Sequence, residues 1–487
     1  MKHIFFMKTI LLSLIFPIFT FAQIQIGDDI IPQPETSAAP TRVVSLSSDG
    51  STVAVGNNVW QGSGIYIDQV RVYRNINNVW TQIGNTIFGE NDDDVFGHSV
   101  ELSCDGNILA ISAVLYDGSN IDSGAVTVYE FVNNVWTQIG NTITGGNNNS
   151  QSGYSLSLSC AGNVVALGAR FSNANGNGSG QVRVYRYISQ SWVLIGGVIN
   201  GEAAGDVSGE SVSLSMNGDI VAIGSLNGDG NGHVRIFKYV NNNWTQQGST
   251  IVGVEFNEAS GRGLSMNCDG TLVAIGASSN DINGNASGQV RVYKYENDTW
   301  TQFGNALNGT NAGDQFGFRV SLSCDGNILA IAAPFNDDDG GSNGAIKIYE
   351  QTDNDWSQIG NTIYGDVGDV SGISMDLSSQ GNIIAFGGFS GNLDGMLGPA
   401  RVYDLSSLLS VDSFTVKPLN YSLVNKVFRL KLKENQSLNS ITIYNTLGQL
   451  LESTSKTSID LSNYNSDVYI FNISINDVTT IKKILLF

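Results

Sequence analysis

The 487-residue chain is poor in proline, in histidine and in positive charge. It has 7 prolines against 57 glycines, which excludes a proline-rich linker protein and indicates a fold rich in glycine turns. Lysine and arginine together number 24 against 44 acidic residues, so the formal net charge is −20. Nucleic-acid binding needs a basic surface, and we therefore expect no nucleic-acid partner.

Recognisable catalytic signatures are also missing. Of the three histidines, His3 lies in the leader, and His98 and His233 stand in different parts of the chain without a partner motif. The sequence has no G-x-S-x-G motif, no P-loop and no metal-ligand spacing. Pairs of acidic residues are too numerous to single out an acid–base couple. The sequence thus predicts no catalytic residue and no cofactor, and it favours a protein that is not an enzyme.

Long apolar runs are confined to the amino terminus. Two lysines precede the apolar residues 10–21, and Ala22 offers a small side chain for cleavage before Gln23. The apolar core is too short to span a membrane comfortably. We expect residues 1–22 to be a secretory signal peptide that is cleaved between Ala22 and Gln23, and the mature protein to be exported.

One repeated unit fills most of the chain. A turn glycine recurs at steps of 56, 56, 56, 52, 56 and 55 residues, at Gly50, Gly106, Gly162, Gly218, Gly270, Gly326 and Gly381. A tryptophan keeps the same register, at Trp80, Trp136, Trp192, Trp244, Trp300 and Trp356. A strand of VRVY type keeps it as well, at residues 70–73, 126–129, 182–185, 234–237, 290–293, 346–349 and 400–403. Three landmarks in one register indicate seven units.

Each unit is expected to form four short strands. In the second unit these strands cover residues 99–103, 108–113, 125–131 and 135–143. An Asp-Gly pair and an Asn-Asn pair supply the tight turns, and the second strand is nearly all apolar, like a strand buried on both faces. No apolar stripe with a helical period of about 3.6 residues appears. Four-stranded units repeated in this way are typical of a β-propeller.

The two ends of the repeat region predict that the ring is closed. The seventh unit stops at residues 402–404 without its tryptophan-bearing fourth strand. Residues 24–30, IQIGDDI, align with residues 137–143, TQIGNTI, from the fourth strand of an earlier unit. An open solenoid would instead need polar capping repeats. The predicted fold class is all-β, with a seven-bladed β-propeller over residues 23–404 that is closed by its N-terminal strand.

The rhythm changes after the repeats. Residues 405–411 are expected to be a linker, and residues 412–487 alternate short apolar strands with turns. This pattern predicts a small Ig-like β-sandwich at the carboxyl end.

The repeat resembles a known family. In the second unit the pattern reads Phe96-Gly97, then Asp105-Gly106, then Ser-Gly-Ala-Val-Thr-Val-Tyr over residues 123–129. It resembles the FG-GAP repeat of integrin-type seven-bladed propellers. That resemblance implies the propeller fold and, in many such repeats, a calcium loop of DxNxDG type in the first hairpin. Here the hairpin is shortened to Asp-Gly and its equivalents, so calcium binding at that position does not carry over.

The tail resembles the C-terminal sorting domain of type IX secretion substrates in Bacteroidetes-type bacteria. The resemblance rests on residues 441–444, on Asn-Thr-Leu-Gly-Gln-Leu at 445–450, and on residues 459–462, 468–470 and 481–484. It implies that the type IX secretion machinery is a partner of this domain and carries the protein across the outer membrane. The expected location is therefore secreted or on the outer-membrane surface.

Acidic residues cluster in two loops. The weak calcium candidates are Asp92, Asp93, Asp94, Asp337, Asp338 and Asp339. Clustered carboxylates can hold Ca²⁺, although aspartate also stabilises turns by binding its own backbone. The position three residues before the glycine that opens a first strand is occupied by Asp94, Ser150, Asp206, Glu258, Asp314 and Asp369. Interchangeable polar residues in one position favour a structural role over a metal site.

The four cysteines share one position in the repeat. Cys104, Cys160, Cys268 and Cys324 each precede the turn of the first hairpin, in two pairs of neighbouring units. A disulfide needs Cα atoms about 4.4–6.8 Å apart, and in a seven-fold ring only the inner end of the first strand comes that close to its neighbour. The pairs Cys104–Cys160 and Cys268–Cys324 are therefore disulfide candidates in an oxidising exterior. The alternative is that cysteine merely replaces the serine found in other units.

Two further sets of side chains recur in register. The tryptophans could stack on sugars as in a lectin, but their fixed spacing favours packing between blades. The arginines of the third strand are expected to pair with acids rather than to bind a ligand. These are Arg71, Arg183, Arg235, Arg291 and Arg401.

The leading functional hypothesis is a binding or adhesion module at the cell surface, whose loops contact a surface glycan or a protein. A second hypothesis is a polysaccharide-binding or polysaccharide-active propeller, either a lectin or a lyase or hydrolase. It predicts a deep central pocket with converging carboxylates and exposed aromatic rings. A third is a surface-layer protein with no small ligand.

Overall fold

The computed structural model describes most of the chain between residues 23 and 485. The described ranges are 23–31, 41–60, 66–91, 93–118, 120–338, 340–388, 398–409, 420–424, 426–432, 437–444, 450–465, 468–475 and 478–485. The signal peptide expected at residues 1–22 lies outside them. The described chain divides into two compact units, which meet in sequence between Leu409 and Ser410.

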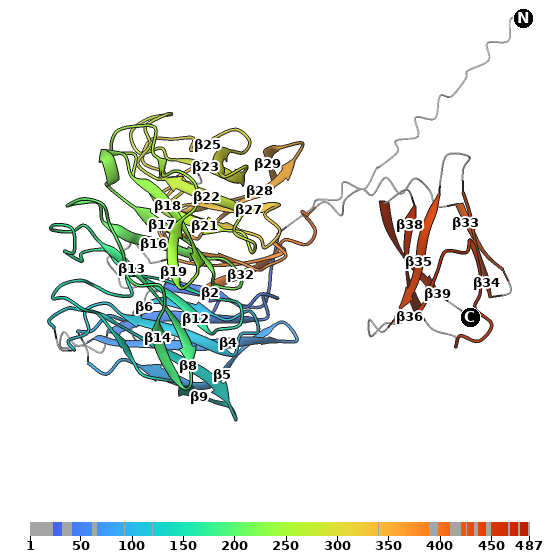
Figure 1. Cartoon of the computed structure of the whole chain (residues 1–487), viewed down its shortest axis with the longest axis horizontal. Coiled ribbons are helices and arrows are strands. Elements are labelled where there is room, and N and C mark those ends of the chain that lie inside the picture. Colours follow the sequence, from blue (N-terminus) through green and yellow to red (C-terminus); the bar gives the residue numbers. More distant parts are fainter. Residues whose placement is uncertain are drawn as a thin grey trace, which may run out of the picture. The chain divides into compact units, whose positions relative to one another are not determined.

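The first unit is built from antiparallel sheets of four or five strands (Figure 1), seven of them among the described residues. A 3₁₀ turn, η1 (Gly228–Gly230), is the one helical element in this part of the chain. The strands are, sheet by sheet, β2 (Thr41–Leu46), β3 (Thr52–Trp60), β4 (Tyr66–Ile76) and β5 (Val79–Phe88); β6 (Phe96–Leu102), β7 (Ile108–Ala113), β8 (Ala125–Val132), β9 (Val135–Gln138) and β10 (Ile143–Thr144); β11 (Ser155–Leu158), β12 (Val164–Ala169), β13 (Gln181–Ile188), β14 (Ser191–Leu194) and β15 (Ile199–Asn200); β16 (Ser208–Leu214), β17 (Ile220–Ser225), β18 (His233–Val240), β19 (Asn243–Gln246) and β20 (Ile251–Val252); β21 (Ser260–Met266), β22 (Leu272–Ala277), β23 (Gln289–Glu296), β24 (Thr299–Gln302) and β25 (Leu307–Asn308); β26 (Arg319–Leu322), β27 (Ile328–Ala333), β28 (Ala345–Thr352) and β29 (Asp355–Tyr364); and β30 (Ser374–Leu377), β31 (Ile383–Gly387), β32 (Arg401–Asp404) and β1 (Ile24–Gln25).

The tight turns follow from local chemistry. In the first hairpin of the second sheet, Gly106 has a φ of +67°, and its N–H donates to the carbonyl of Ser103 at 2.9 Å. The Ser103 hydroxyl in turn accepts from the N–H of Ile108 at 2.9 Å. The second hairpin turns at Asn133 and Asn134, with φ values of +51° and +65°, as a primed turn requires. The turns predicted from the sequence are therefore present.

The fourth strand differs from the expectation. Residues 135–143 were predicted as one strand, but β9 ends at Gln138 and β10 begins at Ile143. Gly140, with a φ of +70°, interrupts the strand, and a Cβ there would lie 2.8 Å from the Trp192 ring of the next sheet. The contact with the tryptophan does not by itself break the strand, because Gly84 packs in the same way against Trp136 and lies within the unbroken β5.

The innermost strands of the seven sheets stand side by side. Strands β2, β6, β11, β16, β21, β26 and β30 contact one another in that order, and β30 also contacts β2. At their ends the backbone N–H of each sheet donates to a carbonyl of the next, over 2.8–3.1 Å. These N–H to C=O bonds run from Ser48 to Cys104, Cys104 to Cys160, Cys160 to Met216, Met216 to Cys268, Cys268 to Cys324, Cys324 to Ser379 and Ser379 to Ser48.

The start of the chain pairs with the last sheet of this unit. Strand β1 is antiparallel to β32, with Ile24 opposite Asp404, and Ile30 forms a further bridge with Ala400. The pairing expected between residues 24–30 and the end of the repeat region is therefore present. Trp80 donates its indole N–H to the carbonyl of Ile26 at 2.7 Å, so this segment contacts the first sheet as well.

Two disulfides lie where the innermost strands converge. Cys104 is bonded to Cys160 and Cys268 to Cys324, and the Cα atoms of each pair are 4.6 Å apart. Each bond joins neighbouring sheets, 56 residues apart in sequence.

The linker predicted at residues 405–411 is shorter than expected. Leu405 is fully buried and Leu408 is 8% exposed, and both pack in a core with Ile348 and Phe386. The first unit therefore continues to Leu409. The physical reason is that these two leucines cover apolar residues of the last sheets, which a solvated linker would leave exposed.

The second unit contains two small antiparallel sheets. Its core comprises Phe428, Ile441, Ile443, Phe471 and Ile473, all fully buried. The strands are β33 (Asn420–Val424), β34 (Val427–Lys431) and β37 (Ser458–Asp460) in one sheet, and β36 (Leu450–Thr454), β35 (Leu438–Tyr444), β38 (Val468–Ile475) and β39 (Val478–Leu485) in the other. Within the described residues of both units, no helix is long and apolar enough to cross a membrane.

Candidate functional site

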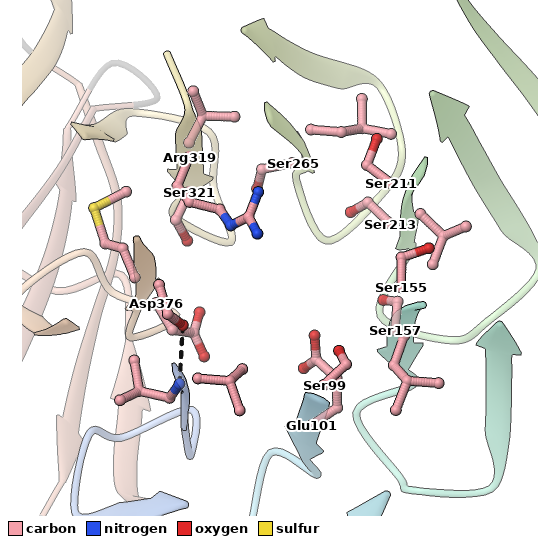
Figure 2. Close-up of a pocket in the computed structure, with 18 of the residues that line it drawn as sticks. Ser99, Glu101, Ser155, Ser157, Ser211, Ser213, Ser265, Arg319, Ser321 and Asp376 are labelled. Carbon is pink, nitrogen blue, oxygen red and sulfur yellow. Dashed lines mark hydrogen bonds between the residues drawn. The ribbon is translucent and has the colours of Figure 1, made fainter. Parts of the chain in front are cut away.

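A cavity of about 860 Å³ lies among the innermost strands of the first unit. All seven of these strands contribute to its wall, from Val43 of β2 to Leu377 of β30. Alternate residues of a strand face the same side, so each strand presents side chains at two levels. Figure 2 labels polar side chains of both levels. Ser99, Ser155, Ser211 and Arg319 form the upper level, and Glu101, Ser157, Ser213, Ser265, Ser321 and Asp376 form the deeper level.

Serine hydroxyls at the deeper level tie neighbouring strands together. Each accepts a hydrogen bond at 3.0 Å from a backbone N–H of the next sheet. The pairs are Ser45 with Leu102, Ser157 with Leu214, Ser213 with Met266, and Ser265 with Leu322. The deeper wall is therefore both polar and rigid.

Two carboxyl groups replace serine at this level. Figure 2 shows Glu101 of β6 and Asp376 of β30 turned toward the open centre. Asp376 accepts from the backbone N–H of Leu46 at 2.7 Å and from that of Leu377 at 2.9 Å. Burial raises the pKa of Asp376 to about 6 although these hydrogen bonds lower it. Burial and the charge of Asp376 raise the pKa of Glu101 well above its usual value.

Two guanidinium groups enter the cavity from adjacent strands, β21 and β26. The Cζ of Arg262 lies 4.4 Å from the ring centre of Phe318, and the Cζ of Arg319 lies 5.0 Å from it. Arg319 also donates to the carbonyl of Phe318 at 3.3 Å. Cation–π contacts of this length orient guanidinium groups, so the cavity has two placed positive charges.

The aromatic rings of the cavity are already covered. The Cζ of Arg170 lies 3.5 Å from the ring centre of Tyr154, and the His98 ring lies 4.8 Å from the same ring. Arg170 also pairs with Glu210 at 3.2 Å. The second sequence hypothesis expected converging carboxylates with exposed aromatics. The cavity has the carboxylates, but the Tyr154 ring is stacked against a guanidinium.

We expect the two cavity carboxyls to make stability depend on pH. Both bind protons more tightly in the folded protein than in the unfolded chain, because their folded-state pKa values are raised. For Asp376 this contribution is present below about pH 4 and is lost as the pH rises through about 6, on the order of 3 kcal/mol; for Glu101 it is lost at a pH well above the ordinary pKa of a glutamate. Denaturant unfolding at pH 4.5 and pH 7 should show this loss for the wild type but not for the Glu101→Gln/Asp376→Asn variant.

Comparing the wild type with this double variant also controls for the other titratable groups of the cavity wall. The variant keeps His98, Tyr154, Glu210, Arg262 and Arg319, so any pH dependence that these groups cause appears in both proteins. Equal pH dependence in the two proteins would show that neither carboxyl is perturbed in the folded state.

The calcium candidates lie apart from this cavity. Asp92 and Asp339 are outside the described residues. Asp94 accepts from the Asn91 amide at 3.0 Å, and Asp338 accepts from the Asn311 amide at 2.6 Å, which is turn and loop chemistry. Asp93 and Asp337 are exposed. In the described parts of the chain, no group of three or more His, Cys, Asp or Glu side chains is placed to hold a metal ion.

The register tryptophans pack between sheets. Five of them donate the indole N–H to a carbonyl in the fourth strand of the preceding sheet, or just beyond it, over 2.9–3.4 Å. The pairs are Trp136 with Ile83, Trp192 with Ile139, Trp244 with Ile195, Trp300 with Gln247 and Trp356 with Phe303. Packing between blades, rather than stacking on sugars, is the role that these contacts support.

The register arginines divide into two groups. Arg291 pairs with Glu258, Arg235 lies 3.8 Å from Glu202, and Arg401 contacts Asp29, Asp366 and Asp369. Arg71 instead donates to the hydroxyl of Thr86 at 3.2 Å. Arg183 belongs to a repeat unit in which Ser150 stands at the position of the usual acid. The Nε of Arg183 has no hydrogen-bond partner among the described residues.

Sequence reasoning did not identify the cavity residues Glu101, Asp376, Arg262 and Arg319. The signal that could have found them is positional. Glu101 and Asp376 occupy the place in the repeat that serine holds in the other five units, and Arg319 stands where four units have serine. A residue on an innermost strand that differs from the serine of the other units is not required for the fold of the repeat, and it is therefore a candidate for a functional role.

The sheets, their inner contacts and the central cavity define the class of the first unit as a β-propeller. Solved structures of this class are similar to it. The periplasmic gluconolactonase of Pseudomonas aeruginosa is 15% identical, with a TM-score of 0.46, over 82% of this chain and 93% of that one. The β-propeller domain of the Trilobed protease from Pyrococcus furiosus is 9% identical, with a TM-score of 0.44, over 75% of this chain and 95% of that one. Identity this low says nothing about shared chemistry.

The second unit has a family match. Residues 424–486 match the model described as "Secretion system C-terminal sorting domain". The tail is thus the sorting domain of type IX secretion, and the protein is secreted and directed to the cell surface. No curated protein matches the chain.

Proposed function

We propose that the protein is a binding module displayed at the cell surface, and that its ligand site is the central cavity of the propeller. The single observation that carries this proposal is the cavity of about 860 Å³, whose wall brings carboxyl, guanidinium and hydroxyl groups together from separate strands. Its volume falls within the range of about 300–1,000 Å³ that is usual for small-molecule sites. Adhesion through a surface glycan is the form of binding that best suits the exported location.

A complete seven-bladed ring of FG-GAP-like repeats is part of the same proposal. The backbone hydrogen bonds that pass from sheet to sheet and return from Ser379 to Ser48 support it. The pairing of β1 with β32 supports closure by the N-terminal segment. A closed ring leaves the cavity open only along the axis, so a ligand would enter by one route.

A polysaccharide-active enzyme is the second candidate. The observation that favours it is the carboxyl pair Glu101 and Asp376, because environments that raise the pKa of an acid suit it to proton donation. The covered Tyr154 ring weighs against it, since a free aromatic face is the usual platform for a sugar ring.

A glycan array with the exported full-length protein tests the proposal. Ser99→Trp would fill the cavity, because Ser99 lines it and points to its centre. The matched control is Thr137→Trp on the exposed outer strand β9. We expect binding to at least one glycan, lost in Ser99→Trp and kept in Thr137→Trp. Binding that survives Ser99→Trp would place the ligand on the loops, and silence on all glycans would contradict glycan adhesion.

A further inference from the structure

We propose that the central cavity recognises a sugar acid, with Arg262 and Arg319 holding its carboxylate and the deeper level taking its hydroxyl groups. This inference rests on the proposed function and names its ligand class. It uses the two guanidinium groups that the cavity wall presents from strands β21 and β26.

The first support is that neither guanidinium group has an ion-pair partner of its own among the described residues: Glu210, whose charge acts on Arg319, is paired with Arg170. Four arginines of the propeller form ion pairs within the described chain: Arg170 with Glu210, Arg235 with Glu202, Arg291 with Glu258, and Arg401 with three aspartates. Neither Arg262 nor Arg319 has an ion pair in that same part of the chain. Arg319 is also exposed within the cavity that it lines.

The second support is the way both groups are held. Arg262 and Arg319 contact the ring of Phe318, which is itself 8% exposed and packs edge-to-face on Phe335. The Phe318 ring keeps two like charges close together, and the acid that acts on Arg319, Glu210, is already bonded to Arg170. An anionic ligand would supply a direct partner for both groups, and planar guanidinium groups match a carboxylate through paired N–H donors.

The charge of the whole protein strengthens the contrast. The chain has a formal charge of −20, so an anion is repelled by most of its surface. Arg262 and Arg319 place two positive charges inside a walled cavity, where an anion can approach them away from the acidic outer surface. A simple anion would need only these two guanidinium groups. The other residues of the cavity wall therefore determine whether a larger ligand can bind.

The remaining wall suits hydroxyl groups. Ser99, Ser155 and Ser211 line the upper level, and Ser321 with the carboxyls of Glu101 and Asp376 lines the deeper one. Carboxyl oxygens and serine hydroxyls are the acceptors and donors that sugar hydroxyls need. Burial raises the pKa of Glu101 and so favours its neutral form, which can donate to a sugar hydroxyl.

Titration calorimetry of the full-length exported protein tests this inference with four probes: D-glucuronate, D-galacturonate, D-glucose and sodium sulfate. We expect at least one of the two uronates to bind, and glucose and sulfate to bind at least tenfold more weakly. Arg262→Gln and Arg319→Gln should each reduce uronate affinity at least tenfold, and Arg319→Lys should restore part of the loss. Lys238→Gln removes an exposed positive charge outside the cavity and should change nothing.

The outcomes separate this inference from the proposed function. Equal binding of glucose and the uronates, unaffected by either arginine variant, would overturn the sugar-acid assignment while the Ser99→Trp result still locates the ligand. Sulfate binding as tight as uronate would reduce the site to a simple anion site. If neither uronate binds, the inference is wrong, whatever the glycan array shows. Thermal unfolding of each variant should match the wild type within a few degrees, which confirms that a lost affinity is not a lost fold.

Discussion

Removing residues 23–31 should lower the free energy of unfolding of the first unit by on the order of 5 kcal/mol. This segment exchanges backbone hydrogen bonds with Val402 and Ala400 over 2.8–3.1 Å, each contributing about 1 kcal/mol. It also buries Ile30, 4% exposed, in a core shared by the first and last sheets, which contributes about 2 kcal/mol. Denaturant unfolding of the exported protein with and without the segment measures the loss.

Two isoleucines of that segment provide a matched pair of point variants. Ile30→Ala removes a buried side chain and should cost about 2–4 kcal/mol. Ile24→Ala changes the same residue type in the same segment, but Ile24 is 61% exposed, and the cost should stay within about 0.5 kcal/mol. If the two variants were equally stable, the burial of Ile30 would not be what holds the N-terminal segment to the last sheet.

Replacing Arg291 by Met should destabilise the protein by about 3–5 kcal/mol. Glu258, its partner, is fully buried and is also held by the backbone N–H of Val254 and the amide of Asn280, each at 2.7 Å. Without the guanidinium the carboxylate remains in the interior with no opposite charge. Denaturant unfolding of the wild type and the variant at pH 7 measures the loss.

The equivalent arginine of another sheet is the control. Arg183 holds the same place in the repeat as Arg291, but Ser150 stands where Glu258 would be. Arg183→Met leaves no buried carboxylate behind, and we expect it to cost about 1 kcal/mol or less. Similar losses from both variants would mean that side-chain packing, rather than the buried charge pair, explains the position.

Much of the fold could be predicted from the repeat because the relevant interactions are local. The strand at residues 108–113 was predicted with the bounds that it has in the structure, since it lies between a glycine turn and a loop and is almost wholly apolar. The break at Gly140 was missed, because the identical segment TQIGNTI at residues 81–87 forms part of the continuous strand β5, so the local sequence does not distinguish the two outcomes. The predicted linker failed at Leu405 and Leu408 for the same kind of reason: their apolar partners lie in distant strands.

The candidate site was harder to predict because its members are far apart in the chain. Glu101 and Asp376 are 275 residues apart, and the sequence contains 44 acidic residues from which to choose. The acidic clusters that stood out in the sequence lie in loops, where Asp94 and Asp338 bind neighbouring amides. Conspicuous local clusters therefore turned out to be loop chemistry, whereas the cavity carboxyls were single residues in otherwise serine positions.

The sequence by itself determined the strands, their turns, the repeat and the sorting domain at the carboxyl end, because glycine turns, apolar alternation and family motifs are properties of short segments. Only the tertiary structure decided which side chains share the central cavity. The innermost strands each contribute two to four residues to its wall, and the arrangement of the whole set brings Arg262 and Arg319 to the same space as Glu101 and Asp376. The proximity of these four side chains depends on all the contacts between the sheets, and no single segment of the sequence determines it.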